Sequence, residues 1–369
     1  MLKKLAYGLV VTLLAGGLLA GCTANINVKP TEGGGINIVA DTGAKGVSNN
    51  SNNKNSSSKS SSKKSTKTYT LKFGDHTSKM YTVTNSANLY MQNKNNRPKR
   101  LSFAGKTLYA MTNDNVLRKY IFEADKWNLK RGSSQSMKSL WEGSHVSANT
   151  NGVYFVKSER PYFLPKEFKT ANVSNPTFCH MEALNNSTAY LYKDGAQVRK
   201  VSIDSKGKVI KSLGIVRKNY DLRKNTGDCI NKDVFMLSDK DGTYYFGQGV
   251  REGHSIGRGV YYDNNLKQKA FFGAKYNSKS STQAKSYISK AGDAVVTDKY
   301  VVFCDKGRAL VKMWVKKTGV FVGSLKYSNL GTTGTTSISM AHMSGNRIML
   351  VANDPNSSNK KDIVRVIDL

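Results

Sequence analysis

The sequence predicts an all-β protein. From Thr68 to Leu369 nearly every apolar run is short, rich in β-branched or aromatic side chains, and bounded by Gly, Asn, Asp or Ser. No long stretch repeats its apolar residues with the 3.6-residue period of a helix. Runs of this kind, separated by polar boundaries, are typical of strands that are joined by tight turns.

The predicted strands also recur as a unit. A strong apolar strand follows a polar turn at several places, which begin at Thr107, Gly152, Thr188, Asp233, Lys299 and Asn346. The clearest unit spans residues 292–326 and has turns at 305–307 and 317–319, and residues 177–214 repeat its plan. Because Asp, Lys and Gly favour the backbone conformations of hairpin turns, each unit is predicted to be a four-stranded antiparallel meander.

A repeat of about 40 to 50 residues that holds four strands has the spacing of a β-propeller blade. The chain therefore resembles a β-propeller, although it has no motif of a named repeat family. Six blades are the first count, and a seventh blade or an insertion around 275–290 would fill the longest interval. The last unit stops after its third strand, so we expect residues 68–73 to supply the outer strand and close the ring. A pair of β-sandwiches or a β-solenoid would share this periodicity.

Residues 1–21 are predicted to be an export signal. Lys3 and Lys4 precede a mostly apolar run that ends at Leu19 and is too short for a stable membrane span. The sequence Leu19-Ala20-Gly21-Cys22 resembles the lipobox of bacterial lipoproteins. That resemblance implies cleavage before Cys22, a diacylglycerol with palmitate-type chains on its sulfur, and anchoring on the extracytoplasmic face of the cell membrane. An ordinary signal peptide or an uncleaved anchor is the alternative interpretation.

Residues 22–67 are predicted to be the lipidated cysteine followed by a linker. The stretch from Ser48 to Lys67 consists almost entirely of Ser, Asn and Lys, so it has no large apolar side chain to bury. We expect such a segment to stay disordered, because burial cannot offset its ordering entropy. A flexible chain of about 45 residues reaches ~35–40 Å on average. The linker would therefore hold the domain at 68–369 away from the membrane.

The charge indicates what kind of partner the exported domain would meet. The chain has 57 Lys and Arg residues against 25 Asp and Glu residues, which gives a net charge of +32. A field of this sign attracts polyanions, and an exported protein would meet wall polymers, acidic glycans and anionic lipids before nucleic acid. We therefore expect an anionic wall polymer, a glycan or an envelope protein as partner, and no nucleic acid. The alternative is a basic surface that only keeps the protein soluble.

Two stretches are candidate binding surfaces. Residues 160–168 place aromatic side chains between prolines and basic residues, a composition that suits sugars or extended peptides. Residues 250–258 form a polar stretch whose basic side chains would hold an anionic group. The candidate ligand-binding residues are Arg160, Tyr162, Phe163, Phe168, Arg251, His254 and Arg258. Ordinary long loops with partly buried aromatics would give the same pattern.

The sequence predicts no catalytic residues, no metal site and no cofactor. His180 and Glu182 would share one face of a strand and could hold a metal or a proton, but an edge pair in a blade is the favoured interpretation. The turn at 239–242 lacks the downstream carboxylates of a calcium loop and is predicted to be a hairpin. Cys179, Cys229 and Cys304 lie in or beside apolar runs and are expected to be buried and free, with one disulfide between two of them as the alternative.

Three functions follow from these features. The favoured one is a membrane-anchored, non-catalytic lipoprotein whose basic propeller head binds or scaffolds an anionic envelope polymer or a protein partner. The alternative is a glycan-acting lyase or hydrolase of the envelope, because propellers also carry enzymes. The third is the substrate-binding lipoprotein of an importer, but that fold needs alternating helices and parallel strands, which the sequence does not show.

Overall fold

The structure is a computed structural model of the chain. It describes residues 26–30, 36–40 and 67–369, apart from gaps at 86–100, 112–115, 137–145, 158–159, 169, 176–179, 194–196, 219–229, 252–253, 266, 275–283, 333–336 and 354–361. The chain divides into two compact units, Met1–Lys63 and Lys64–Leu369. In the first unit, β1 (Ile26–Pro30) and β2 (Ile36–Ala40) pair as an antiparallel hairpin within the predicted linker.

The second unit consists of six sheets, which we number as blades 1 to 6 in chain order. Blade 1 contains β6 (Leu101–Ala104), β7 (Thr107–Met111), β8 (Val116–Glu123) and β9 (Asn128–Ser136). Blade 2 contains β10 (Val146–Asn149), β11 (Gly152–Lys157), β12 (Arg160–Pro165) and β13 (Asn172–Val173). Blade 3 contains β14 (His180–Ala183), β15 (Thr188–Lys193), β16 (Gln197–Ile203) and β17 (Val209–Lys218).

The remaining three blades follow the same order. Blade 4 contains β18 (Ile230–Asp239), β19 (Gly242–Arg251), β20 (His254–Asp263) and β21 (Gln268–Phe272). Blade 5 contains β22 (Ala291–Val296), β23 (Tyr300–Asp305), β24 (Leu310–Val315) and β25 (Phe321–Lys326), followed by the short 3₁₀ helix η2 (Tyr327–Leu330). Blade 6 begins with β26 (Ser337–Ser344), β27 (Arg347–Asn353) and β28 (Ile363–Asp368). Within the described part of the chain, no helix has the length and apolar character needed to span a membrane.

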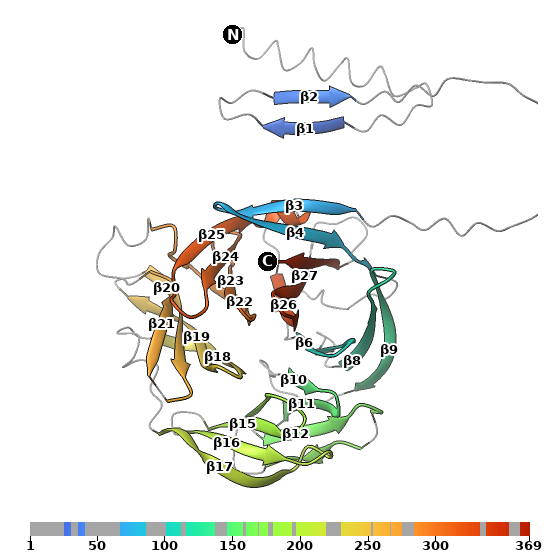
Figure 1. The fold of residues 1–369 in the computed structure, drawn as a ribbon, viewed down its shortest axis with the longest axis vertical. Helices are drawn as coiled ribbons and strands as arrows, with labels where there is room; N and C mark the ends of the chain where they lie inside the picture. Colours follow the sequence, from blue (N-terminus) through green and yellow to red (C-terminus); the bar gives the residue numbers. More distant parts are fainter. Residues whose placement is uncertain are drawn as a thin grey trace, which may run out of the picture. The chain divides into compact units, whose positions relative to one another are not determined.

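The blades form a closed ring, which confirms the predicted propeller with six blades (Figure 1). The first strand of each blade contacts the first strand of the next, from β6 through β10, β14, β18, β22 and β26. The ring closes because β26 also contacts β6. Side-chain oxygens on three of these strands accept a backbone N–H of the following blade: Ser102 Oγ from Ala148 at 2.9 Å, Ser147 Oγ from Ala183 at 2.8 Å, and Asp293 Oδ2 from Met340 at 2.7 Å.

The described residues in the longest interval of the sequence pattern form no seventh blade. Asp233 lies in β18, the first strand of its blade, whereas the other recurring strands are the second strands β7, β11, β15, β23 and β27. Two strands of 10 residues each, β19 and β20, lengthen the interval further. The interval also includes residues 275–290, of which 275–283 lie outside the described residues.

The N-terminal part of the domain completes blade 6, as predicted, but with a different strand at the junction. β4 (His76–Thr82) pairs with β28, and β3 (Thr68–Phe73) pairs with β4 as a fifth strand. The sequence predicted the outer strand at residues 68–73, and β3 is the outermost strand of this sheet, but β4 lies between it and β28. Residues 68–82 form a hairpin about Gly74, so the second arm of the hairpin takes the inner place and the first arm lies outside it.

The chain then passes from blade 6 to blade 1. β5 (Thr84–Asn85) pairs in parallel with β9, the outer strand of blade 1, directly after β4 has paired with β28. Val83 between them is buried with residues of both blades. The segment from 68 to 85 thus joins the last blade to the first.

The hydrophobic core is divided among the interfaces between blades. Each of the six largest clusters of buried side chains takes its members from two neighbouring blades. In β11, for example, Val153 and Phe155 pack toward blade 1 while Tyr154 packs toward blade 3. Both faces of a blade are therefore buried, which explains why second strands such as β11 and β23 are nearly continuous apolar runs.

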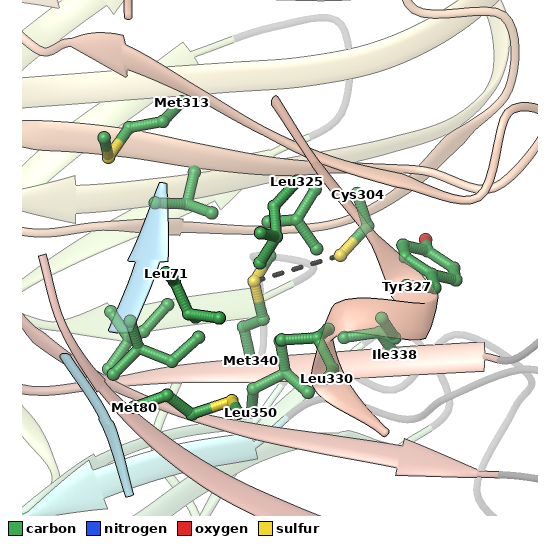
Figure 2. Packing of buried hydrophobic residues seen from close by; sticks show 14 of the residues in the cluster. Leu71, Met80, Cys304, Met313, Leu325, Tyr327, Leu330, Ile338, Met340 and Leu350 are labelled. Atoms are coloured by element: carbon green, nitrogen blue, oxygen red, sulfur yellow. Dashed lines mark hydrogen bonds between the residues drawn. The ribbon is translucent and has the colours of Figure 1, made fainter. Parts of the chain in front are cut away.

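The interface between blades 5 and 6 includes the two N-terminal strands. Leu71 of β3 and Met80 of β4 pack with side chains of both blades (Figure 2). In the same cluster the Cys304 thiol lies 3.9 Å from the Met340 sulfur. Cys304 is free and buried, as predicted, and burial raises the pKa of its thiol. Cys179 and Cys229 lie outside the described residues.

If ring closure depends on this packing, shortening Met80 should destabilise the whole domain. We expect Met80→Ala to lower the free energy of unfolding by about 2–5 kcal/mol, because it leaves a cavity in a fully packed interface. The neighbouring Lys79→Ala is the control, since Lys79 is exposed on the same strand and should change stability by less than about 0.5 kcal/mol. Urea unfolding followed by circular dichroism measures both, and equal unfolding midpoints for the two variants would contradict this role of β4.

Candidate functional site

The topology places two sets of turns at the same end of the ring. In an antiparallel meander the turn between the first and second strands and the turn between the third and fourth strands lie at one end of the sheet. The first strands of all six blades line the ring in the same sense, so these turns gather on one face, which we call the turn face. All six blades have the turn between the first and second strands, and blades 1 to 5 have the turn between the third and fourth strands, because blade 6 takes β4 from the N-terminal part of the domain.

Lysines dominate the turn face. The turn between the third and fourth strands carries at least one exposed lysine in each of blades 1 to 5: Lys126, Lys166, Lys206 with Lys208, Lys267 and Lys317. The turns between the first and second strands add exposed Lys106, Lys240 and Lys299. In these described turns the exposed acidic residues are Asp125, Glu167 and Asp298. The face therefore has an excess of positive charge that is spread around the ring.

Short-range hydrogen bonds fix these turns. Asp204 Oδ1 accepts the backbone N–H groups of Lys206 and Lys208 at 2.9 and 2.8 Å. Asp263 Oδ1 accepts those of Asn265 and Lys267, both at 2.9 Å. An Asp side chain that binds its own backbone in this way stabilises a turn. The aspartates thus hold the backbone while the lysine side chains remain exposed.

A cavity of about 460 Å³ opens between blades 1 and 2 at this face. Three lysines contribute to its lining: Lys106 from the first turn of blade 1, Lys119 from β8, and Lys166 from the third turn of blade 2. The remaining lining residues are Ala104, Gly105, Thr107, Tyr109, Ile121, Asn149, Thr150 and Glu167. Basic and hydroxyl-bearing side chains from two blades therefore surround one opening.

Lys119 is the best-fixed cation of this cavity. Its ammonium donates a hydrogen bond of 2.5 Å to the backbone carbonyl of Lys166 and lies 5.1 Å from the centre of the Phe168 ring. Phe168 in turn packs on Tyr109, with 6.1 Å between the ring centres. Burial, and secondarily the charge of Glu167, raise the pKa of Tyr109 to about 12, so its hydroxyl stays protonated at physiological pH.

Lys316, which follows β24 of blade 5, is a buried lysine whose charge is already neutralised by carboxylates. Lys316 is 1% exposed, and its ammonium lies 2.7 Å from Asp241 and 2.9 Å from Asp239. The hydrogen bond from Lys316 lowers the pKa of Asp241. Burial alone would lower the pKa of Lys316, but its hydrogen bonds to both carboxylates outweigh burial and raise it. The turn at 239–242 is the predicted hairpin, and it locks blade 4 to blade 5.

The aromatic residues predicted to bind a ligand have separate positions. Phe163 is fully buried between blades 2 and 3. Tyr162 is half-buried and stacks on Phe155, with 5.7 Å between the ring centres. Arg160 is exposed at the start of β12. Only Phe168 borders the cavity, through its contact with Lys119. The predicted loop at 160–168 is thus a strand of the blade followed by a turn, and its aromatic rings pack within the protein.

The second predicted stretch lies on blade 4. Arg251 and His254 face each other across the end of the β19–β20 hairpin, and their side chains lie outside the described residues. Arg258 is 2% exposed and lies 5.4 Å from the centre of the Phe271 ring. Burial lowers the pKa of its guanidinium to about 10. Cys22 lies outside the described residues, so its lipidation stays a prediction.

The described residues show no group of three or more His, Cys, Asp or Glu side chains that would hold a metal ion. His180 and Glu182 both lie in β14, and the side chain of His180 lies outside the described residues. The sequence analysis did not find Lys106, Lys119 and Lys166. Lys106 and Lys166 lie in turns and Lys119 lies within β8, and lysine is frequent throughout this chain, so no local signal marks these three.

No protein-family model matches this chain, and no curated protein matches it significantly. Solved structures with a similar course of the chain include a calcium-binding regucalcin from Agrobacterium tumefaciens, with a TM-score of 0.42, 9% identity, and coverage of 78% of this chain and 95% of the other. U3-55K has a TM-score of 0.42 and 10% identity, with coverage of 76% of this chain and 97% of the other. The WD40 domain of Neurospora crassa Pan2 has a TM-score of 0.40 and 10% identity, with coverage of 74% of this chain and 89% of the other. At these values the comparisons indicate no ligand or activity.

If Lys316 locks blade 4 to blade 5, removing its charge should destabilise the domain. We expect Lys316→Met to lower the free energy of unfolding by about 3 kcal/mol, because it leaves two carboxylates beside a buried apolar side chain. Lys317→Met is the control, since Lys317 is exposed and adjacent. Urea unfolding at neutral pH measures both. A Lys316→Met variant as stable as Lys317→Met would contradict the lock.

The same ion pairs should make stability depend on pH. The pKa of Asp241 lies below its usual value of 3.8, so the unfolded chain takes up its proton at higher pH than the folded chain does. The contribution of this pair is therefore present at neutral pH and is lost as the pH falls below about 4. Unfolding free energies between pH 6 and pH 3 should fall less steeply in Lys316→Met than in the unchanged protein. Parallel curves for the two proteins would count against this assignment.

Proposed function

We propose that this protein is a membrane-anchored lipoprotein of a bacterial envelope and that the turn face of its propeller binds an anionic polymer without catalysis. The observation that carries the proposal is the exposed lysine in the third turn of five successive blades, which distributes positive charge around the ring. A long polyanion would contact several of these turns at once. In this proposal the positive net charge serves to bind a polyanion rather than only to keep the protein soluble.

Lysine suits such a role because its ammonium is a compact charge on a flexible stem. It meets a repeating anion without demanding one fixed geometry, unlike the planar guanidinium of arginine. Each contact between exposed charges is weak and screened by salt, so useful affinity requires many contacts on one polymer. A ring of turns supplies these contacts from a rigid scaffold.

The anchor and the linker would set where this binding occurs. Acylation of Cys22 would hold the chain at the membrane, and a linker of about 45 residues would place the propeller ~35–40 Å away on average. Anionic polymers that extend from the membrane or through the wall lie within that reach. The partner class is therefore an anionic wall polymer or an acidic glycan rather than nucleic acid.

The arrangement of the described carboxylates favours binding over hydrolysis. Asp239 and Asp241 are paired with Lys316. Asp305 is paired with Lys312 at 3.3 Å, and both side chains are fully buried. Glycoside hydrolysis uses two carboxyl groups that face a common substrate, whereas these carboxylates serve contacts between elements of the ring. This distinction separates the proposal from the alternative of a glycan-acting enzyme.

The proposal predicts salt-sensitive binding through the turn face. We expect the full chain to be retained on immobilised poly(glycerol phosphate) at about 50 mM salt and released at about 0.5 M, because screening weakens contacts between exposed charges. A variant with Lys126, Lys166, Lys206, Lys267 and Lys317 replaced by Gln should bind about tenfold more weakly or worse. Retention is measured as bound fraction against salt concentration.

The matched control removes the same number of lysine charges from the predicted linker instead of from the turn face. Lys54, Lys59, Lys63, Lys64 and Lys67 replaced by Gln should leave retention nearly unchanged. The proposal is wrong if the linker variant loses binding while the turn-face variant keeps it, or if retention is insensitive to salt. Release of shortened fragments from an acidic glycan such as polygalacturonate, which has the glycosidic bonds that poly(glycerol phosphate) lacks, would instead support the glycan-acting enzyme.

A further inference from the structure

We infer that the cavity between blades 1 and 2 is a subsite for one phosphate-bearing polyol unit of a phosphodiester-linked polymer. This inference rests on the proposed function and goes beyond it, because it assigns a defined pocket and a ligand chemistry. The cavity holds about 460 Å³ and opens on the turn face. It is therefore continuous with the lysine-bearing turns that a polymer would follow.

The charge of the lining selects an anion. Lys106, Lys119 and Lys166 contribute three positive charges, and Glu167 contributes one negative charge that lies 4.0 Å from the Lys166 ammonium. Both members of that pair are exposed, so their attraction is weak and does not remove Lys166 from use by a ligand. The remaining excess of positive charge at one opening favours a group with at least one full negative charge.

The central cation is held in place before a ligand arrives. The Lys119 ammonium donates one hydrogen bond to the Lys166 carbonyl and rests against the Phe168 ring. An ammonium has three N–H groups, so two others are available to a ligand oxygen. Because Lys119 is already ordered by these contacts, binding at this position costs less side-chain entropy than it would at a fully exposed lysine.

Hydroxyl groups at the rim suit a polyol. The Thr150 hydroxyl donates a hydrogen bond of 2.7 Å to Asn186 Oδ1, which fixes its direction and leaves its oxygen able to accept. Thr107 lines the cavity from blade 1. Tyr109 also lines it and keeps its hydroxyl protonated, because burial raises the pKa of that hydroxyl to about 12. A ligand with hydroxyl groups next to its charge finds both donors and acceptors here.

The aromatic residues argue for charge recognition rather than stacking on a sugar ring. The ring of Phe168 is engaged by Lys119 on its face and packs on Tyr109. Tyr109 is itself 2% exposed. Neither ring presents an open face of the kind on which a pyranose stacks. The chemistry of the cavity therefore fits a phosphate with a small polyol better than an acidic sugar.

The test measures the affinity of the full chain for a short poly(glycerol phosphate) oligomer by isothermal titration calorimetry at low salt. We expect Lys106→Gln with Lys166→Gln to weaken binding by about tenfold or more, because both charges line the cavity. The control pair, Lys206→Gln with Lys317→Gln, removes the same charge from exposed turns of other blades and should weaken binding by about threefold or less. Thr107→Tyr fills the cavity without changing charge and should also weaken binding.

The outcomes separate this inference from the proposed function. Equal weakening by the two double variants, together with unchanged binding by Thr107→Tyr, would overturn the subsite while leaving the turn face as the binding surface. Binding of polygalacturonate as tightly as the phosphodiester oligomer would overturn the preference for phosphate. Absence of binding to either polymer would overturn the proposed function itself. Circular dichroism melting curves that match those of the unchanged protein confirm that each variant is folded.

Discussion

The pairing of β4 with β28 is the contact on which the rest of this structure depends. Every blade buries both of its faces against neighbours, so a ring with one open end would expose an apolar face on each side of the gap. β4 and β3 add Met80 and Leu71 to the cluster between blades 5 and 6 (Figure 2), and Val83 joins the cluster between blades 6 and 1. Closure thus couples the chain next to the predicted linker to the C-terminal strands.

Closure also decides where a ligand can be bound. Because the sheet faces are used for packing, the ends of the ring and the outer strands remain exposed, and the described turns of the turn face carry exposed lysines in blades 1 to 5. The buried lysines, unlike the lysines of the turn face, are paired with carboxylates. Lys316 and Lys312 each pair with carboxylates inside the protein, whereas the exposed turn lysines lie on the surface. Buried pairs therefore stabilise the scaffold, and the surface charge is left for recognition.

Most of the fold could be predicted from the sequence, because a blade strand that is buried on both faces needs apolar side chains at nearly every position and therefore shows as a short apolar run. The position of β4 could not, since residues 68–73 and 76–82 are both plausible edge strands and only their pairing tells them apart. The candidate site was missed for a related reason. Lys106, Lys119 and Lys166 are brought together from two blades, and no local pattern connects them. Phe163 was misleading because a buried ring and a binding ring look alike in sequence.

The most direct test of the account is hydrogen–deuterium exchange of the full chain with and without poly(glycerol phosphate), read by mass spectrometry. The account predicts slower exchange in peptides that cover the turns at 104–107, 166–168, 204–208 and 316–320, and unchanged exchange in residues 23–67. Protection confined to the linker, or to the loops at the opposite end of the ring, would contradict it.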